Sequence, residues 1–206
     1  QARNANYIWD EVDLFFGRIK YIIFPLIWIL RKLDVKQAQQ PDYIISNSKF
    51  VQEWVKETYK RDSVVIYPPV DLSNFDLEIT KKDYYVVVGR LAPIKRFDIA
   101  VRVFNKLNTT LYVIGDGEES SALQKLAKSP NIHFTGFLSS KEVNQYIRHA
   151  KGLIQVGIEG FGITSIEAQA CGTPVIAYGK GGVLETIIEE ETGVLFHQQT
   201  DEALEE

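Results

Sequence analysis

The alternation of short apolar runs with helix-patterned stretches, which starts at Asp42, constrains the fold more than any other feature of the sequence. Runs rich in valine, isoleucine and tyrosine predict strands, and the stretches between them, with apolar residues at helical spacing, predict helices. Strand and helix in regular turn are typical of parallel βαβ units. Most runs are continuously apolar, as in strands buried on both faces. We therefore predict an α/β fold with a parallel sheet flanked by helices.

The alternation predicts the position of each strand and helix. Strands are expected at residues 43–46, 64–67, 84–88, 111–114, 132–135, 153–156, 175–177 and 194–196. Helices are expected at residues 49–60, 97–107, 119–127, 140–149, 163–170 and 184–188, and the polar residues before Glu206 predict the start of another.

The paired prolines Pro68 and Pro69 mark the clearest break, because proline interrupts both a sheet ladder and a helix. We place a hinge at residues 68–80. Residues 1–67 are then the expected last elements of a preceding domain, and residues 81–206 a second domain that is truncated at its end. Since the chain begins without methionine and shows no charged-then-apolar leader, we expect it to be an internal piece of a longer protein.

Composition and net charge argue against three features: nucleic-acid binding, an internal disulfide and a metal site. A formal net charge of -4 argues against a nucleic-acid binder, which carries a basic excess over one face. The single Cys171 excludes an internal disulfide and fits a reducing, cytoplasmic location. Because His133, His149 and His197 lie far apart in the sequence, we expect no metal site and no metal cofactor.

The first candidate site is Gly89-Arg90-Leu91 with Lys95 and Arg96, directly after the strand expected at residues 84–88. Open α/β sheets bind ligands at the carboxyl ends of their strands. A glycine lets the loop turn, and an arginine with a lysine can clamp a diphosphate and stabilise a leaving group. The alternative is a solvated loop with ordinary surface cations.

The second candidate is the motif from Glu159 to Glu167, which follows the strand expected at residues 153–156 and opens a helix. Gly160 and Gly162 allow close backbone approach, and the helix start offers unpaired amides to a phosphate. One glutamate precedes the helix and the other lies in its second turn, so one carboxylate can face a sugar and the other a ribose. The alternative makes both glutamates ordinary surface charges.

Three further loops follow expected strands. Gly115-Asp116-Gly117 is either a phosphate loop or, as we favour, a tight turn. Residues 179–182, which include Lys180, fit a ligand loop and a structural loop equally well. Gly136 and Phe137 are candidates for contacting a nucleobase, although burial under a loop is the more common place for such an aromatic side chain.

All these candidates follow parallel strands and therefore share one edge of the sheet. In this arrangement the chain resembles the retaining glycosyltransferases with the two-domain GT-B fold, family four, also called glycosyl transferases group 1. The resemblance covers about residues 42–196 and rests on Gly89-Arg90-Leu91 with Lys95, Gly115-Asp116-Gly117, residues 159–177 and Gly181-Gly182.

The resemblance implies a Rossmann-like carboxyl-terminal domain that binds a nucleotide-sugar donor, with residues 1–67 belonging to the acceptor domain. It implies that Arg90 and Lys95 bind the donor diphosphate, that Glu159 contacts the transferred sugar, and that Glu167 holds the ribose hydroxyls. These first three residues are also the expected catalytic residues. The other implied donor-binding residues are Gly89, Gly136, Phe137, Phe161, Gly162, Ile163 and Thr164.

Three features look most like mannosyltransferases of surface polysaccharide synthesis: residues 67–71, Asn47-Ser48, and Gly162-Ile163 with Glu167-Ala168-Gln169-Ala170. This finer resemblance implies GDP-mannose as donor and a saccharide or lipid-linked acceptor. The resemblance also implies retention of configuration, and two cations with a helix start supply the positive charge that a metal ion would otherwise provide. The alternatives are a non-catalytic nucleotide-sugar-binding module and a sugar epimerase. The pairing of Glu159 with Glu167 favours transfer.

Residues 14–36 combine five basic residues and one acid with many apolar and aromatic side chains. The apolar run at residues 21–30 is too short to span a bilayer, which needs roughly 20 residues. The segment is expected to be either a helix buried against the preceding domain, which we favour, or an interfacial helix that faces anionic lipid. The second alternative implies a peripheral position at the inner face of the membrane.

Overall fold

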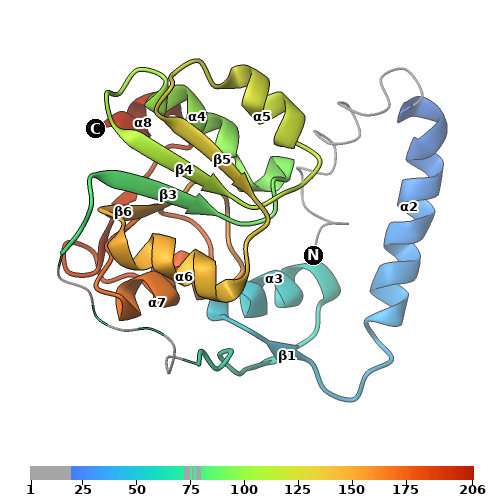
Figure 1. Ribbon diagram of the computed structural model, residues 1–206. Coiled ribbons are helices and arrows are strands. Elements are labelled where there is room, and N and C mark those ends of the chain that lie inside the picture. The colour runs from blue at the N-terminus through green and yellow to red at the C-terminus, as the bar shows by residue number, and fades with distance from the viewer. Residues whose placement is uncertain (1–19, 72–74, 76, 78–79) are drawn as a thin grey trace. The chain divides into compact units, whose positions relative to one another are not determined.

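The structure of the protein, a computed structural model, describes residues 20–71, 75, 77 and 80–206 (Figure 1). The chain forms two compact units, Gln1–Tyr67 and Pro68–Glu206. The second unit begins at the paired prolines, where neither a central strand nor a helix can continue.

The first unit is built around one βαβ element. β1 (Ile45–Ser46) pairs in parallel with β2 (Val64–Val65), and α3 (Lys49–Tyr59) connects them. The side-chain oxygen of Ser48 accepts a hydrogen bond from the Val51 amide at 3.0 Å, which caps the first turn of α3. The helix expected at residues 49–60 is present as α3, and Ser48 caps its first turn.

α2 (Lys20–Gln37) precedes this element and contains much of the basic and aromatic segment. Its side chains Trp28, Ile29, Leu30 and Leu33 are between 45% and 53% exposed. A groove of about 650 Å³ is lined by Trp28, Arg31, Lys32, Val35, Lys36, Gln39, Tyr59 and Lys60. Residues 14–19 of the segment lie outside the described residues. In the described part of the chain, no helix has the length and apolar character to cross a membrane.

The second unit contains a six-stranded sheet in which every neighbouring pair is parallel. Its order across the sheet is β5-β4-β3-β6-β7-β8. The chain therefore moves outward from β3, returns to the centre, and moves outward again from β6 in the opposite direction. Such a reversal is a topological switch point, where a doubly wound sheet opens a crevice beyond the carboxyl ends of its strands. The strands are β3 (Tyr84–Val88), β4 (Thr110–Ile114), β5 (Ile132–Gly136), β6 (Gly152–Gln155), β7 (Val175–Tyr178) and β8 (Gly193–Phe196).

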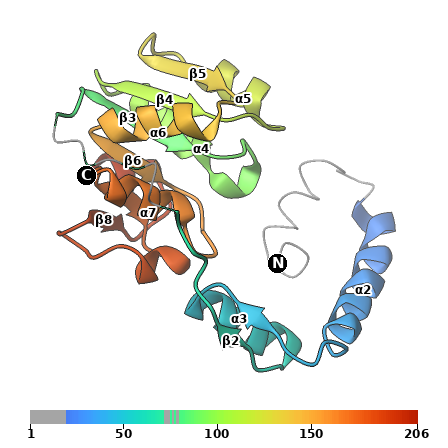
Figure 2. The same ribbon diagram turned by 60° about the horizontal axis from the view of Figure 1, so that its bottom comes forward.

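Helices cover both faces of this sheet (Figures 1 and 2). α4 (Phe97–Phe104), α5 (Ser120–Leu126) and α8 (Asp201–Glu205) lie on one face, and α6 (Ser140–His149) and α7 (Ile163–Ala170) lie on the other. Neighbouring strand residues alternate between the two cores, as Val86 and Val87 do. This explains why the strands read as uninterrupted apolar runs. The predicted α/β fold with a parallel sheet flanked by helices is confirmed.

Local sequence sets where the helices on the site side begin. α6 starts after a capping box, in which the Glu142 amide donates to Ser139 Oγ at 3.4 Å and the Ser139 amide donates to the Glu142 carboxylate at 2.9 Å. α7 starts differently, after Gly162 in the left-handed region at φ 90°, with no side-chain cap. The first amides of α7 are therefore not satisfied by a capping side chain.

The structure contains all the expected strands, and α3 to α7 match expected helices within a few residues. The prediction of a helix at residues 184–188 is wrong. The structure has a short 3₁₀ helix there, η3 (Gly182–Glu185). Leu184 and Ile188 have helical spacing but are more than half exposed, whereas Val183 and Ile187 are buried. The Ile187 amide still donates to the Val183 carbonyl at 3.0 Å, but the chain does not continue into an α-helix.

Candidate functional site

The two strands at the switch point each bring one charged residue into a shared ion pair. Lys95 ends η2 (Pro93–Lys95) after β3, and Glu159 lies in the loop after β6. The Lys95 ammonium donates a hydrogen bond to the Glu159 carboxylate. The two side chains are 27% and 20% exposed. Because water screens such a pair only partly, it ties the two loops together more firmly than a surface pair does.

Arg90 lies at the same edge but pairs with a different carboxylate. Its Nε donates a hydrogen bond to Glu118 at 3.1 Å, and its side chain is 75% exposed. An exposed pair of this kind contributes little to stability, so Arg90 can exchange partners at small cost. We did not expect Glu118 from the sequence. Its place directly after Gly115-Asp116-Gly117, a loop beside Gly89, was the available signal.

Backbone hydrogen bonds join the loops after β3, β4 and β5. The Gly89 amide donates to the Ile114 carbonyl and the Gly115 amide to the Gly136 carbonyl, both at 3.0 Å. Gly115 lies so close to Gly89 that a Cβ atom there would stand 1.9 Å from the Gly89 carbonyl oxygen. Gly115-Asp116-Gly117 is thus packed against the Gly89 loop, and the turn that leads into α5 begins after it, at Glu118.

A similar contact joins the loops after β6 and β7. The Gly182 amide donates to the Glu159 carbonyl at 2.8 Å, and a Cβ atom at Gly182 would stand 2.3 Å from the Gly160 carbonyl oxygen. The loop at residues 179–182 therefore supports the backbone that carries Glu159. Lys180 in this loop is exposed, and its contact with a phosphate stays a prediction.

α7 brings its first turn and Glu167 to the same edge of the sheet. The first-turn amides of Ile163 and Thr164 have no carbonyl partner within the helix. Burial raises the pKa of the Glu167 carboxyl above its ordinary value. Perturbed carboxyls of this kind concentrate at functional sites. The position fits a carboxylate that accepts hydrogen bonds from a ligand.

The two aromatic candidates differ in exposure. Phe161 is buried, so its contribution to a ligand site is limited to its backbone. Phe137 is 83% exposed, and the alternative that it is buried under a loop is wrong. Three strand spacings, roughly 14 Å, separate the end of β5 beside Phe137 from the end of β6. Phe137 and Glu159 would therefore contact different parts of an extended ligand.

The structure brings Lys95 and Glu159 into contact and places the remaining expected residues at the same edge of the sheet, on its loops, at the end of β5 or on α7. Their roles toward a nucleotide-sugar donor stay predictions. Within the described ranges, no group of three histidine, cysteine, aspartate or glutamate side chains is arranged to hold a metal ion.

Comparison with known proteins shows which family the chain matches. The chain matches the family model described as glycosyl transferases group 1 over residues 71–206. It is 29% identical to an uncharacterized glycosyltransferase of Methanocaldococcus jannaschii over 80% of this chain and 48% of that protein. It is 30% identical to the O-antigen chain mannosyltransferase of Salmonella typhimurium over 84% of this chain and 52% of that protein. The chain thus spans about half the length of these curated relatives.

A solved structure shares the fold. The Anabaena protein HepE, in complex with UDP and glucose, superposes with a TM-score of 0.75 at 20% identity, over 85% of this chain and 55% of that chain. The family match includes the whole six-stranded sheet and every loop of the candidate site. From this match we conclude that the chain belongs to the glycosyl transferases group 1 family.

Proposed function

We propose that the full-length protein is a glycosyltransferase that moves a sugar from a nucleotide-sugar donor to a saccharide or lipid-linked acceptor. The Lys95–Glu159 pair at the switch point carries the proposal. A cation at this position suits the diphosphate of a donor, and a carboxylate on the neighbouring loop suits the hydroxyls of its sugar.

Donor binding in this proposal is an exchange of partners. Lys95 and Arg90 release Glu159 and Glu118 and bind the diphosphate oxygens instead. The freed Glu159 then accepts hydrogen bonds from the sugar, while Glu167 accepts them from the ribose. The first-turn amides of α7 add unpaired donors for an oxygen of the sugar or the phosphate.

The proposed reaction breaks the bond between the sugar C1 and the diphosphate oxygen. A new bond from C1 to the acceptor hydroxyl oxygen forms on the same face of the sugar, so the configuration is retained. The acceptor proton passes to an oxygen of the leaving diphosphate. Arg90 and Lys95 stabilise the negative charge that develops there. No protein nucleophile and no metal ion take part.

The donor that we propose is GDP-mannose. The resemblance of residues 67–71 to mannosyltransferases and the description of the Salmonella relative support it. A UDP-sugar is the competing assignment, because the Anabaena neighbour is in complex with UDP and glucose. In this proposal the reaction takes place in the cytoplasm, where Cys171 stays reduced.

The test is turnover by the full-length protein with GDP-mannose, UDP-glucose and UDP-N-acetylglucosamine in turn, each with saccharide and lipid-linked acceptors. We expect transfer from one donor, and loss of transfer in Lys95→Ala and Glu159→Ala. Nucleotide binding without transfer from any donor would favour the non-catalytic module instead. Absence of nucleotide binding would overturn both.

A further inference from the structure

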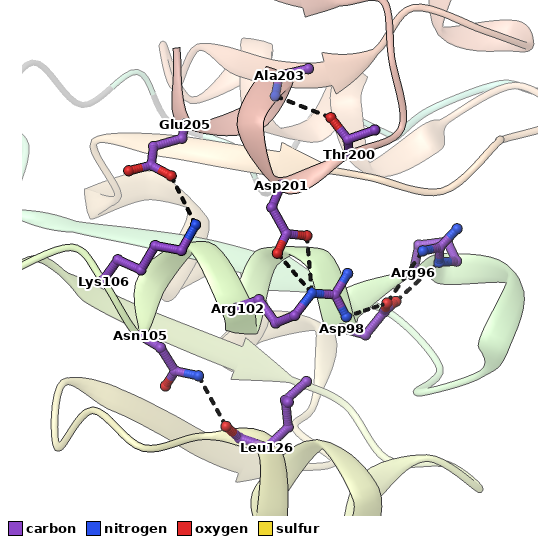
Figure 3. A network of polar contacts seen from close by, with 10 residues as sticks. All are labelled: Arg96, Asp98, Arg102, Asn105, Lys106, Leu126, Thr200, Asp201, Ala203 and Glu205. Carbon is purple, nitrogen blue, oxygen red and sulfur yellow. Dashed lines mark hydrogen bonds and ion pairs between the residues drawn. The ribbon is translucent and has the colours of Figure 1, made fainter.

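A chain of polar contacts runs from the last helix to the loop that carries Lys95 (Figure 3). Arg102 on α4 donates from Nε to both carboxylate oxygens of Asp201, the first residue of α8, at 3.0 and 2.8 Å. The same guanidinium donates to Asp98 at 2.8 Å. Asp98 also accepts two hydrogen bonds from Arg96, at 3.1 and 3.3 Å. Arg96 directly follows Lys95 in the chain.

Charge stabilises this network. Burial acts to raise the pKa of Asp98, but the hydrogen bonds from Arg96 and Arg102 outweigh it and lower the pKa of this carboxyl below its ordinary value. The hydrogen bond to Asp201 in turn raises the pKa of Arg102. Arg96 needs such support, because its backbone is left-handed at φ 52°, a region that residues other than glycine adopt only at a cost.

Gln199 connects the network to the second loop of the site. It lies between β8 and α8, and its Nε2 donates to the Val156 carbonyl at 2.8 Å. Its Oε1 accepts a hydrogen bond from Arg96 at 3.5 Å. Val156 directly follows β6, where the loop to Glu159 begins. One amide side chain therefore contacts both loops that flank the switch point.

These two loops already touch through their backbones. A Cβ atom at Gly157 would stand 2.6 Å from the Ile94 carbonyl oxygen and 2.8 Å from the Lys95 Cα. No side chain fits between them at this point. The Lys95–Glu159 pair and the contacts of Gln199 with Arg96 and Val156 also connect these two packed loops.

We propose that Gln199 is a positioning residue that holds the Lys95 loop at the distance from the Glu159 loop that a donor diphosphate requires. The inference rests on the proposed function. Gln199 acts through Arg96 and Val156 and does not itself touch the donor, and the Arg102–Asp201 contact anchors the segment on which it lies. Residues after the last strand of the sheet thus set the geometry of loops that come from its centre.

The test measures GDP and UDP binding by the full-length protein. Gln199→Ala is expected to weaken binding about three- to tenfold, the range for the loss of one or two net hydrogen bonds. In a Lys95→Ala background the same substitution is expected to have no further effect, because its action passes through Lys95. Gln199→Glu keeps the acceptor for Arg96 but loses the donor for Val156, and is expected to recover part of the affinity.

Glu205→Gln is the matched control. Glu205 also links α8 to α4, through Lys106 at 3.2 Å, but it belongs to neither loop of the site (Figure 3). We expect this variant to bind as the wild type does. Equal losses in Glu205→Gln and Gln199→Ala, or a loss from Gln199→Ala that persists unchanged in the Lys95→Ala background, would overturn the positioning role.

Two further results separate this inference from the proposed function. Wild-type affinity in Gln199→Ala together with weak binding in Lys95→Ala would overturn the inference and leave the function standing. If the wild type bound neither GDP nor UDP, the proposed function would fail, and the inference with it.

Discussion

At the scale of single residues, both candidate phosphate-binding cations hold glutamates. Lys95 holds Glu159 and Arg90 holds Glu118. A diphosphate therefore competes with a carboxylate at each cation. The competition differs between the two, because Arg90 is far more exposed than Lys95.

We expect Lys95→Ala to weaken GDP binding by roughly 1.5–3 kcal/mol, the range for a hydrogen bond to a charged group. Arg90→Ala should fall at the lower end of the same range, because water already solvates its side chain. Calorimetric titration measures both. Lys151→Ala is the control, since Lys151 precedes β6 at the opposite edge of the sheet and pairs with Asp83. Wild-type affinity in both site variants would contradict the diphosphate assignment.

Glu159 and Glu167 are expected to have different roles, one toward the sugar and the other toward the ribose. Glu167→Ala should lose affinity for any ribonucleotide, with or without an attached sugar, because it loses the acceptor for the ribose hydroxyls. Glu159→Ala should still bind GDP but lose turnover in the full-length protein. Titration with GDP and a transfer assay distinguish the two. If both variants behaved alike toward GDP, the sugar-side and ribose-side roles would be wrong.

Glu167 also predicts a pH dependence. Its carboxylate binds hydroxyls in the ionised form, so nucleotide-sugar affinity should fall as the pH falls through its pKa, which burial raises above 4.5. Stability changes in the opposite direction: with a folded-state pKa above the unfolded value, this group makes folding less favourable as the pH rises through that range. GDP-mannose titrations from about pH 4 to about pH 8 should show a weaker pH dependence in Glu167→Gln than in the wild type. Parallel pH profiles would exclude Glu167 as the titrating group.

The sequence indicated candidate site residues where they directly follow an expected strand. It did not indicate residues whose contacts are with a segment distant in the sequence. Lys95 and Glu159 were found because both lie just beyond apolar runs. Gln199 was missed, because it reaches Val156 only after the chain has crossed back from the edge strand β8. Nothing in the spacing of Gln199 along the sequence signals that contact.

At the scale of elements, the loops of the site are packed backbone against backbone. We expect Gly115→Ala to lower the free energy of unfolding by about 3 kcal/mol or more, because its Cβ would overlap the Gly89 carbonyl oxygen. Gly136→Ala is the matched control, since Gly136 has φ 71° but open space around a Cβ atom. Its expected cost is about 1–2 kcal/mol, from backbone strain alone. Urea unfolding that gave equal costs for the two variants would contradict this packing.

The second element-scale prediction concerns α2. We expect the full-length protein to co-sediment with anionic vesicles more than with neutral ones, because exposed Trp28 and Leu33 lie among basic residues on this helix. Lys32 keeps its ammonium 3.7 Å from the centre of the Trp28 ring, a combination suited to a membrane interface. The measurement compares the wild type with a variant in which Arg18, Lys20, Arg31 and Lys32 are neutralised.

Loss of the anionic preference in that variant is the expected result. A preference that survived neutralisation, or no preference in the wild type, would leave the alternative in which α2 is buried against the preceding domain.

Elements were predictable because each carries its own signal. Apolar runs predicted the strands, and apolar residues at helical spacing predicted the helices between them. The exception is η3, where the four-residue spacing of Leu184 and Ile188 predicts a helix but only a short 3₁₀ helix forms. Periodicity alone cannot distinguish an α-helix from a short 3₁₀ helix followed by a turn.

At the scale of the whole molecule, the sequence predicted parallel strands but not their order. The order places β3 beside β6, and this adjacency alone brings Lys95 to Glu159. Side-chain pattern is the same for a strand at the centre and its neighbour, so no local signal specifies the switch point. The family resemblance implied a Rossmann-like domain, but the strand order itself comes from the structure.

The pairing of Tyr85 with Gly152 has a consequence for how the molecule assembles. The half of the sheet from β3 to β5 can form from contacts between successive elements, and so can the half from β6 to β8. Joining the halves closes the longest loop in the sheet, a step that costs chain entropy before any contact is gained. The crevice that we propose for the nucleotide is therefore complete only when the two halves are joined. A bound nucleotide would bias the chain toward the joined state by mass action, and would slow the parting of the two halves.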